Sequence, residues 1–151
     1  MKVLMAILFI TGLAFAQQTD SIKASGGEKN KLASLTVKII NLKNDKGQVL
    51  MALCNSEENY NDDENPYRGG SAGIKDSIAV YIFENLPFGE YAVKVIHDEN
   101  NNSELDTNFL GIPKEAYGFS NDARGTFGPP DYDDAKFLVS KEKSQIVIKL
   151  D

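Results

Sequence analysis

Apolar and polar residues alternate in several short segments of the chain, and a period of two is typical of a β-strand with one buried face. No segment sustains the longer period of an amphipathic helix. Strands are therefore expected at residues 35–42, 48–54, 77–86, 90–98, 135–140 and 145–150. Short strands separated by turn signals predict an all-β fold, a single antiparallel β-sandwich.

Turn-forming residues indicate how these strands are connected. NDKGQ follows the first strand, so the first two strands are expected to form a hairpin. Pro87 and Gly89 in LPFGEY predict a tight turn before the strand at 90–98, and the polar KEKS joins the last two strands. Residues 55–73, which include the acidic run 62–64, are expected to be a long solvated loop.

The strand at 90–98 has two unlike faces. Tyr91, Val93, Val95 and His97 share one face, which is expected to be buried, and Lys94 lies on the other, which is expected to be partly exposed. His97 is the only histidine of the chain. A buried structural histidine is favoured over a transition-metal ligand, because such a metal would need further histidine or cysteine ligands.

The N-terminus has the pattern of a secretory signal peptide. Lys2 precedes an apolar run at residues 3–15, and Ala14-Phe15-Ala16 fits a signal peptidase site. The run is shorter than the roughly 20 residues of a membrane-spanning helix; an uncleaved anchor or a buried strand is the alternative. We expect a signal peptide at 1–16, a flexible leader at 17–33 and one β-sandwich domain at 34–151, located in the periplasm or secreted.

Charge and cysteine content exclude some functions. The formal net charge of −6 gives no electrostatic basis for binding nucleic acid. Cys54 is the only cysteine, and its apolar surroundings in VLMALC predict a buried, unreactive thiol. After cleavage the chain is not expected to be an integral membrane protein. An envelope or extracellular partner of unknown identity is expected.

The stretch 98–134 separates the fourth and fifth expected strands and lacks a strand pattern of its own. Loops longer than about 12–15 residues are uncommon in compact domains unless they are functional or disordered. This loop carries enough apolar side chains to pack down, and they are Leu105, Phe109, Leu110, Ile112, Tyr117, Phe119, Phe127 and Tyr132. A bound cation is one way to satisfy part of its backbone.

DENNNSELD, residues 98–106, partly matches a calcium-binding loop. Oxygen ligands occupy positions 1, 3, 5, 7 and 9 of that template, and the chain offers there Asp98, Asn100, Asn102, the Glu104 carbonyl and Asp106. Alternate side chains point inward because the chain curls around the ion. An Asx turn that satisfies its own polar groups is the alternative, since Asn and Asp are common in turns.

Two positions depart from the calcium template. Ser103 replaces the glycine of the sharp turn, and Phe109 replaces the bidentate glutamate. The missing acid would have to come from downstream, where Glu115 is the first candidate, followed by Asp122, Asp131, Asp133 and Asp134. With two formal charges in the motif, we expect weak calcium binding, in the ~10⁻⁴–10⁻³ M range of extracellular modules.

LPFGEYAVKVIHDENNNSELDTNFLGIPKEAYGFSNDA, followed by GPPDYDDAKF, resembles the exported bacterial family catalogued as domain of unknown function 2141. The resemblance covers residues 35–150 and implies an exported β-sandwich similar to immunoglobulin-like or transthyretin-like (prealbumin-like) domains, with no established activity. Ser103 departs from the Asn-Gly often found in that family's loop. The F-x-x-L-P-x-G-x-Y-x-V pattern at 83–93 is similar to carboxypeptidase-regulatory-like modules, which are binding or structural modules.

The sequence therefore favours a non-enzymatic exported module with a calcium-organised loop. Its ligand or partner surface is expected at His97, Tyr117, Phe119, Asn121, Phe127 and Tyr132. Alternatively, these aromatic residues only cover the sandwich. An envelope hydrolase that uses His97, Asp98 or Glu115 as acid or base is the second hypothesis, and a purely structural envelope protein is the third.

Overall fold

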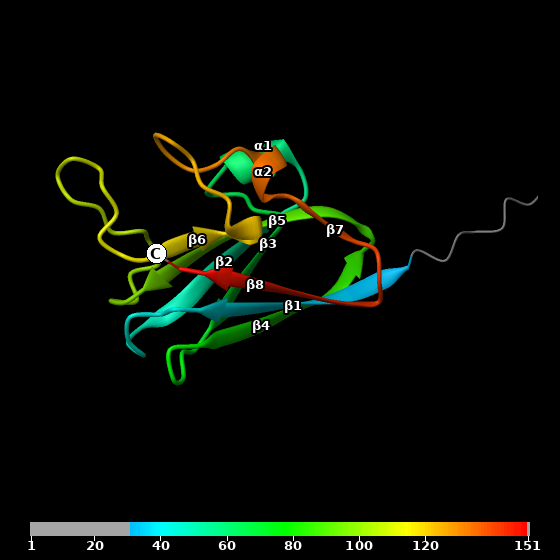
Figure 1. The fold of residues 1–151 in the computed structure, drawn as a ribbon, viewed down its shortest axis with the longest axis horizontal. Helices are drawn as coiled ribbons and strands as arrows, with labels where there is room; N and C mark the ends of the chain where they lie inside the picture. The colour runs from blue at the N-terminus through cyan, green and yellow to red at the C-terminus, as the bar shows by residue number, and fades with distance from the viewer. Residues whose placement is uncertain (1–30, 151) are drawn as a thin grey trace, which may run out of the picture.

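The computed structural model describes residues 31–150, in which two β-sheets pack face to face (Figure 1). The three-stranded sheet has the order β4-β1-β8, with β1 at Leu32–Ile40, β4 at Ala79–Pro87 and β8 at Lys143–Lys149. The five-stranded sheet has the order β3-β2-β5-β6, and β7 also pairs with β5. Its strands are β2 (Gln48–Cys54), β3 (Arg68–Ala72), β5 (Gly89–Asp98), β6 (Tyr117–Phe119) and β7 (Phe137–Val139). The predicted all-β sandwich is confirmed.

The N-terminal predictions are only partly covered by these residues. The expected signal peptide, 1–16, and residues 17–30 of the expected leader lie outside the described part of the chain. Strand β1 already begins at Leu32, so the end of the expected leader belongs to the sandwich. No helix formed by residues 31–150 has the length and apolar character that crossing a membrane requires.

The expected hairpin between the first two strands is wrong. Strand β1 pairs with β4 and β8, whereas β2 pairs with β3 and β5 in the opposite sheet. Residues 41–47 exceed the usual hairpin loop of about 2–5 residues, and they carry the chain across the gap of about 10 Å between packed sheets. The β1–β8 pairing is parallel, so the sandwich is not purely antiparallel.

The predicted turn at LPFGEY passes the chain from one sheet to the other. Strand β4 ends at Pro87 and β5 begins at Gly89, with Phe88 alone between them. The hydroxyl of Tyr91 donates to the Pro87 carbonyl over 2.7 Å and closes the corner. This corner aligns β5 in the middle of its sheet, where β2 lies on one side and β6 and β7 on the other.

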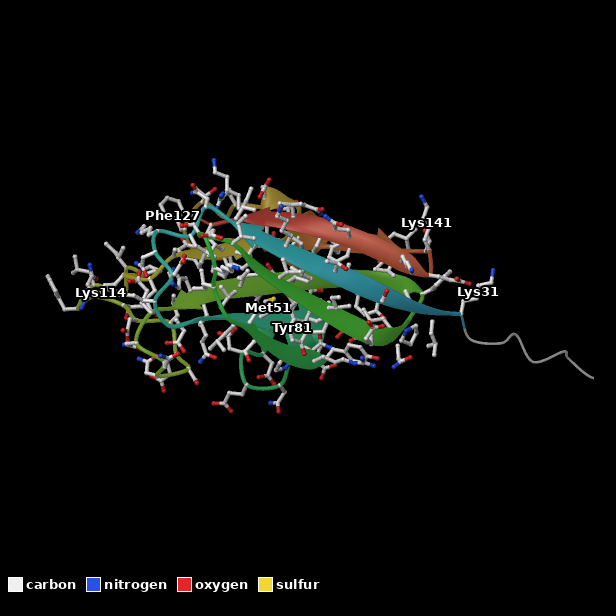
Figure 2. The ribbon with its side chains drawn as sticks, turned by 90° about the horizontal axis from the view of Figure 1, so that it is seen from below. Lys31, Met51, Tyr81, Lys114, Phe127 and Lys141 are labelled. Carbon is white, nitrogen blue, oxygen red and sulfur yellow. The ribbon has the colours of Figure 1, made fainter. Side chains whose placement is uncertain are left out.

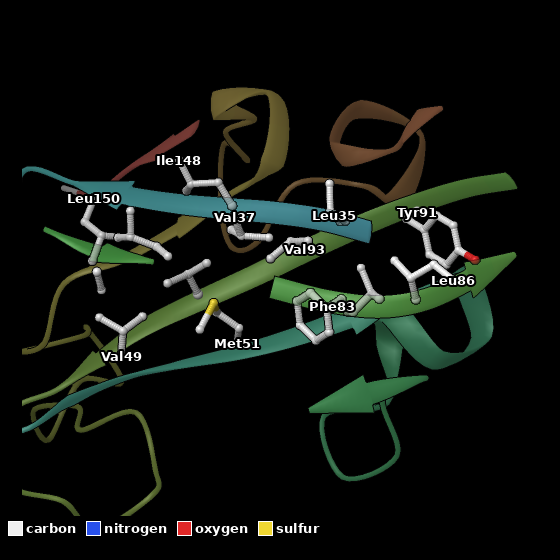
Figure 3. Packing of buried hydrophobic residues seen from close by; sticks show 14 of the residues in the cluster. Leu35, Val37, Val49, Met51, Phe83, Leu86, Tyr91, Val93, Ile148 and Leu150 are labelled. Atoms are coloured by element: carbon white, nitrogen blue, oxygen red, sulfur yellow. The ribbon is translucent and has the colours of Figure 1, made fainter. Parts of the chain in front are cut away.

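The main core fills the space between the sheets (Figure 3). Alternation turns one side chain in two inward, and Figure 3 shows Leu35 and Val37 of β1 facing Val49 and Met51 of β2, with Val93 between them. Fully burying a side chain of this size contributes about 1.5–3 kcal/mol. The packing therefore fixes the position of β5 and of the loop that follows it.

A second cluster lies on the outer face of β5 and is covered by short helices. These helices are α1 (Glu57–Asn61), α2 (Tyr132–Ala135) and the 3₁₀ turn η1 (Ser120–Asp122). The covered residues are Cys54, Tyr60, Ala92, Phe119, Ala123 and Ala135. The segment expected as a solvated loop, 55–73, thus contains both α1 and β3, and the segment expected to lack strands, 98–134, contains β6.

Candidate functional site

The candidate loop begins where β5 ends, at the end of the sandwich that carries Lys114 and opposite the end with Lys31 and Lys141 (Figure 2). Asp98 is the last residue of β5 and pairs with Gln48 of β2. The Gln48 side-chain amide donates to Asp98 Oδ2 over 3.1 Å. The strand ladder therefore fixes the first residue of the loop.

The Asp98 carboxylate organises the turn that follows. It is fully buried, and it accepts the backbone amide of Asn102 at Oδ1 over 3.0 Å and that of Ser103 at Oδ2 over 3.1 Å. Hydrogen bonds to an ionised acceptor are about twice as strong as neutral ones. Asn101 and Ser103 adopt left-handed φ angles of 60° and 66°. Asn tolerates this conformation. Ser103 stands at position 6, where the calcium template has glycine.

Asp106 closes the same loop from its other end. The side-chain amides of Asn100 and Asn102 donate to its two carboxylate oxygens over 2.6 and 3.0 Å. The side-chain oxygens of these two asparagines accept the amides of Asn102 and Glu104 over 3.0 and 2.9 Å. Four of the predicted ligands, Asp98, Asn100, Asn102 and Asp106, thus lie in one hydrogen-bonded network.

Glu115 returns to this loop, but both of its carboxylate oxygens accept backbone amides there, whereas the sequence predicts it as a metal ligand. Its Oε1 accepts the amide of Glu99 over 2.9 Å, and its Oε2 accepts the amide of Asp106 over 3.0 Å. Glu115 reaches them because the backbone amide of His97 donates to the carbonyl of Ala116 over 2.8 Å, which places the returning chain beside β5. The buried Glu115 carboxylate is therefore a brace between the two ends of the loop.

The donor set fits a hard cation better than a transition metal. The candidate ligands offer only carboxylate, amide and carbonyl oxygens, which calcium prefers. Among residues 31–150, no group of three or more histidine, cysteine, aspartate and glutamate side chains is arranged to hold a metal ion. A site at this loop would therefore depend on the two asparagine amides in addition to Asp98 and Asp106.

His97 is enclosed in the sandwich. Its side chain is fully buried, and its Nε2 lies 2.8 Å from the Lys46 carbonyl. Its Nδ1 is the one buried side-chain nitrogen or oxygen without a partner in the described part of the chain. The hydrolase hypothesis needs His97 to reach a substrate, and the full burial of its side chain opposes this. A separate pocket beside the start of β1 is lined by Ala33, Glu84 and Lys143 among others.

Three residues of the expected ligand surface gather around Tyr60. The Tyr60 ring lies 6.5 Å from Phe119 and 5.6 Å from Tyr132, and Tyr117 packs edge-on against Phe119 at 6.0 Å. Lys94 Nζ donates to the Tyr60 carbonyl over 2.7 Å and pairs with the Asp63 carboxylate at 2.6 Å. Tyr60 and Phe119 are buried members of the second cluster, and Tyr117 and Tyr132 are partly buried against it, so only these last two rings are partly open to solvent.

The other expected surface residues have different environments. Asn121 adopts φ of 60°, and its side-chain amide donates to the carbonyls of Asp134 and Lys136 over 3.1 and 2.8 Å. It therefore fastens η1 to α2. Phe127 is 101% exposed, and Phe109, Leu110 and Ile112 are exposed too, so the expectation that these apolar residues pack down is wrong.

Cys54 has the environment of a structural thiol. Its side chain is fully buried, and its Sγ lies 3.4 Å from the Asn59 carbonyl. Burial raises the pKa of the Cys54 thiol to about 11, and the nearby Lys94 offsets this only partly. Since the thiolate is the nucleophile, this cysteine is not an activated one.

Comparison with known proteins identifies one family. The model of the family described as "Uncharacterized protein conserved in bacteria (DUF2141)" matches residues 37–147. No curated protein and no solved structure matches the chain. The matched residues include the five-stranded sheet, most of the three-stranded sheet and the whole of the loop with Glu115.

Proposed function

The chain belongs to the DUF2141 family of uncharacterised bacterial proteins, and we propose that it is an exported, non-enzymatic β-sandwich module whose 98–106 loop binds calcium weakly. The observation that carries the proposal is the network that joins Asp98, Asn100, Asn102 and Asp106 at the end of β5. Export rests on the signal pattern of residues 1–16.

The side-chain amides of Asn100 and Asn102 could turn to replace their hydrogen bonds to Asp106 with contacts to a cation. Their NH₂ groups now face the carboxylate of Asp106 and offset its negative charge. Half a turn of each amide about its last side-chain bond would present the oxygen to the ion instead of the nitrogen. The backbone amides of Asn102 and Glu104 donate to these two oxygens in the present structure and would lose those bonds. Asp98, Asn100, Asn102 and Asp106, with the carbonyl of Glu104, would then hold the ion.

Glu115 and Gln48 would position this site. Gln48 holds Asp98, and the Glu115 carboxylate keeps the Glu99 and Asp106 amides at a fixed spacing. A bound calcium ion would join the two ends of the loop by binding the carboxylates of both Asp98 and Asp106. Since only two formal charges belong to the ligand set, a dissociation constant of ~10⁻⁴–10⁻³ M is expected.

Calorimetric titration of the EDTA-treated protein with calcium, together with thermal melting, tests the proposal. At ~10 mM calcium, binding in this range stabilises the fold by about 1.4–2.7 kcal/mol. Asp106→Asn should abolish both the heat and the stabilisation. Asp131→Asn, which alters a carboxylate that makes no side-chain cap hydrogen bond, should keep both. If calcium up to ~10 mM produces no heat and no rise in melting temperature, the calcium site is ruled out.

A further inference from the structure

Residues 107–113 form a tip that projects from the end of the sandwich and carries three exposed apolar side chains (Figure 1, the yellow loop between β5 and β6). Phe109 is 94% exposed, Leu110 68% and Ile112 56%. Side chains of this kind are usually buried, and their concentration on one short segment marks an interaction site.

Internal hydrogen bonds hold the tip closed. The side-chain oxygen of Asn108 accepts the amides of Leu110 and Ile112 over 2.9 and 3.1 Å. The Asn108 amide donates to the Ile112 carbonyl over 2.8 Å, and the Gly111 amide donates to the Asn108 carbonyl over 2.9 Å. A bridge between Thr107 and Pro113 closes the base. The apolar side chains are therefore presented by an ordered turn.

The same hydrogen bonds indicate whether the tip binds a lipid surface or a protein. The amides of Asn108, Leu110, Gly111 and Ile112 are already satisfied inside the turn, whereas the Phe109 amide and the carbonyls of residues 109–111 have no partner among the described residues. Backbone entering hydrocarbon must have its polar groups satisfied internally, so the remaining groups stay among water and headgroups and only the apolar side chains enter the acyl chains. A protein partner would instead be recognised through outward hydrogen bonds, of which interfaces carry roughly one per 100–200 Å². The convex tip directs few donors outward, so it fits a lipid surface better than a protein pocket.

We propose that this tip inserts into the interfacial layer of a lipid bilayer. Phe109, Leu110 and Ile112 enter the boundary between headgroups and acyl chains, where apolar side chains of peripheral proteins bind. Lys114 lies directly behind the tip and is exposed, so its ammonium group remains at the level of the lipid phosphates. The inference is independent of calcium binding, because the tip is closed by its own hydrogen bonds.

The charges behind the tip select the type of membrane. The adjoining loop carries Glu99, Glu104 and Asp106 against Lys114, and the 41–47 connection, which Asn44 joins to Glu99, adds Asp45 and two lysines. Carboxylates therefore still outnumber lysines at this end. An anionic membrane would repel these carboxylates within a Debye length of about 8–10 Å. The tip therefore prefers zwitterionic lipid, and a cation that neutralises the loop raises binding to anionic lipid only.

Co-sedimentation with phosphatidylcholine/phosphatidylethanolamine vesicles in EDTA tests the inference, with phosphatidylglycerol-containing vesicles as the second arm. The full protein should pellet with the zwitterionic vesicles. Phe109→Ser combined with Leu110→Ser should lower the partition coefficient by roughly tenfold or more, since each side chain loses its apolar burial. The same pair should leave the melting temperature unchanged, because both side chains are exposed.

Val80→Thr combined with Ile82→Thr is the matched control. These β4 side chains are 50% and 48% exposed on the outer sheet face, and this variant should bind vesicles as the unmodified protein does. Absence of vesicle binding, or equal binding by the tip variant, would overturn the inference. So would tip-dependent dimerisation without vesicle binding, which would identify a second copy as the partner. Because all samples contain EDTA, failure of the calcium titration does not alter these outcomes.

Discussion

The backbone amide of Ser103 donates to the buried carboxylate of Asp98 over 3.1 Å, and Ser103 makes this bond with a left-handed φ of 66°. A residue with a Cβ atom pays about 1–2 kcal/mol in that conformation, whereas glycine adopts it freely. The loop thus holds one strained residue at the position where the calcium template has glycine.

Replacing Ser103 by glycine should stabilise the protein. The gain is expected to be about 0.5–1 kcal/mol, because relief of the left-handed strain exceeds the extra backbone entropy of glycine in the unfolded chain. Urea unfolding measures it as a higher midpoint at constant slope. Ser103→Ala keeps the Cβ atom and should show no gain, so equal stability of the two variants would contradict the explanation.

The Glu115 brace should be detectable in the loop itself. Glu115→Gln leaves one acceptor oxygen and turns an NH₂ group toward the second amide, which is expected to cost about 1.5–3 kcal/mol. Hydrogen exchange at the amides of Glu99 and Asp106 should become faster. Exposed Glu104→Gln is the control and should change stability by less than about 0.5 kcal/mol. Unchanged exchange at both amides would show that Glu115 does not hold the loop.

The strands of the sandwich could be predicted from alternation, but their partners could not. Leu35, Val37 and Ile39 identify β1 as a half-buried strand, yet nothing local shows that it pairs in parallel with β8. Strand β3 was missed because RGGSA contains no apolar alternation. Its pairing comes from the adjacent β2 rather than from its own side chains.

The candidate site shows the same division. Asp98, Asn100, Asn102 and Asp106 are close in the sequence, so their proximity in the structure could be predicted from it. The role of Glu115 depends on the contact between His97 and Ala116, which forms only when the chain folds back along β5. Exposure of Phe109 was not predicted, because the Asn108 turn that presents it outweighs its tendency to be buried.

Stability should fall in alkaline solution because burial raises the pKa of four acidic groups, Cys54, Tyr60, Tyr91 and Tyr132. Burial raises the pKa of Cys54 from 9.0 to about 11 and that of Tyr60 from 10.0 to about 12. Below about pH 9 both groups are neutral whether folded or unfolded. Between 9.0 and about 11 the unfolded chain loses the Cys54 proton first, so the free energy of unfolding decreases as pH rises.

The Cys54 contribution to this loss is up to about 2.7 kcal/mol for a shift of about two pH units. Urea unfolding at several pH values from about 8 to about 11 measures it. Cys54→Ala should flatten the profile over the lower part of this range. Tyr60→Phe should make the fall above about pH 10 shallower, and the raised pKa values of Tyr91 and Tyr132 account for the rest. An unchanged slope in Cys54→Ala would contradict the assignment.

The contact between β6 and β8 depends on the absence of a side chain at Gly118. A Cβ atom there would lie 2.9 Å from Leu150 Cδ2, 3.1 Å from Ile148 Cγ2 and 3.1 Å from the Lys149 carbonyl. Because one of these atoms is backbone, β8 would have to shift, and Gly118→Ala is expected to cost about 1–3 kcal/mol in urea unfolding.

Gly69→Ala is the matched control in another strand, where a Cβ atom meets nothing within 4 Å. It should be neutral or slightly stabilising because alanine restricts the unfolded chain. Equal effects of the two substitutions would show that close approach of β6 to β8 does not contribute to stability.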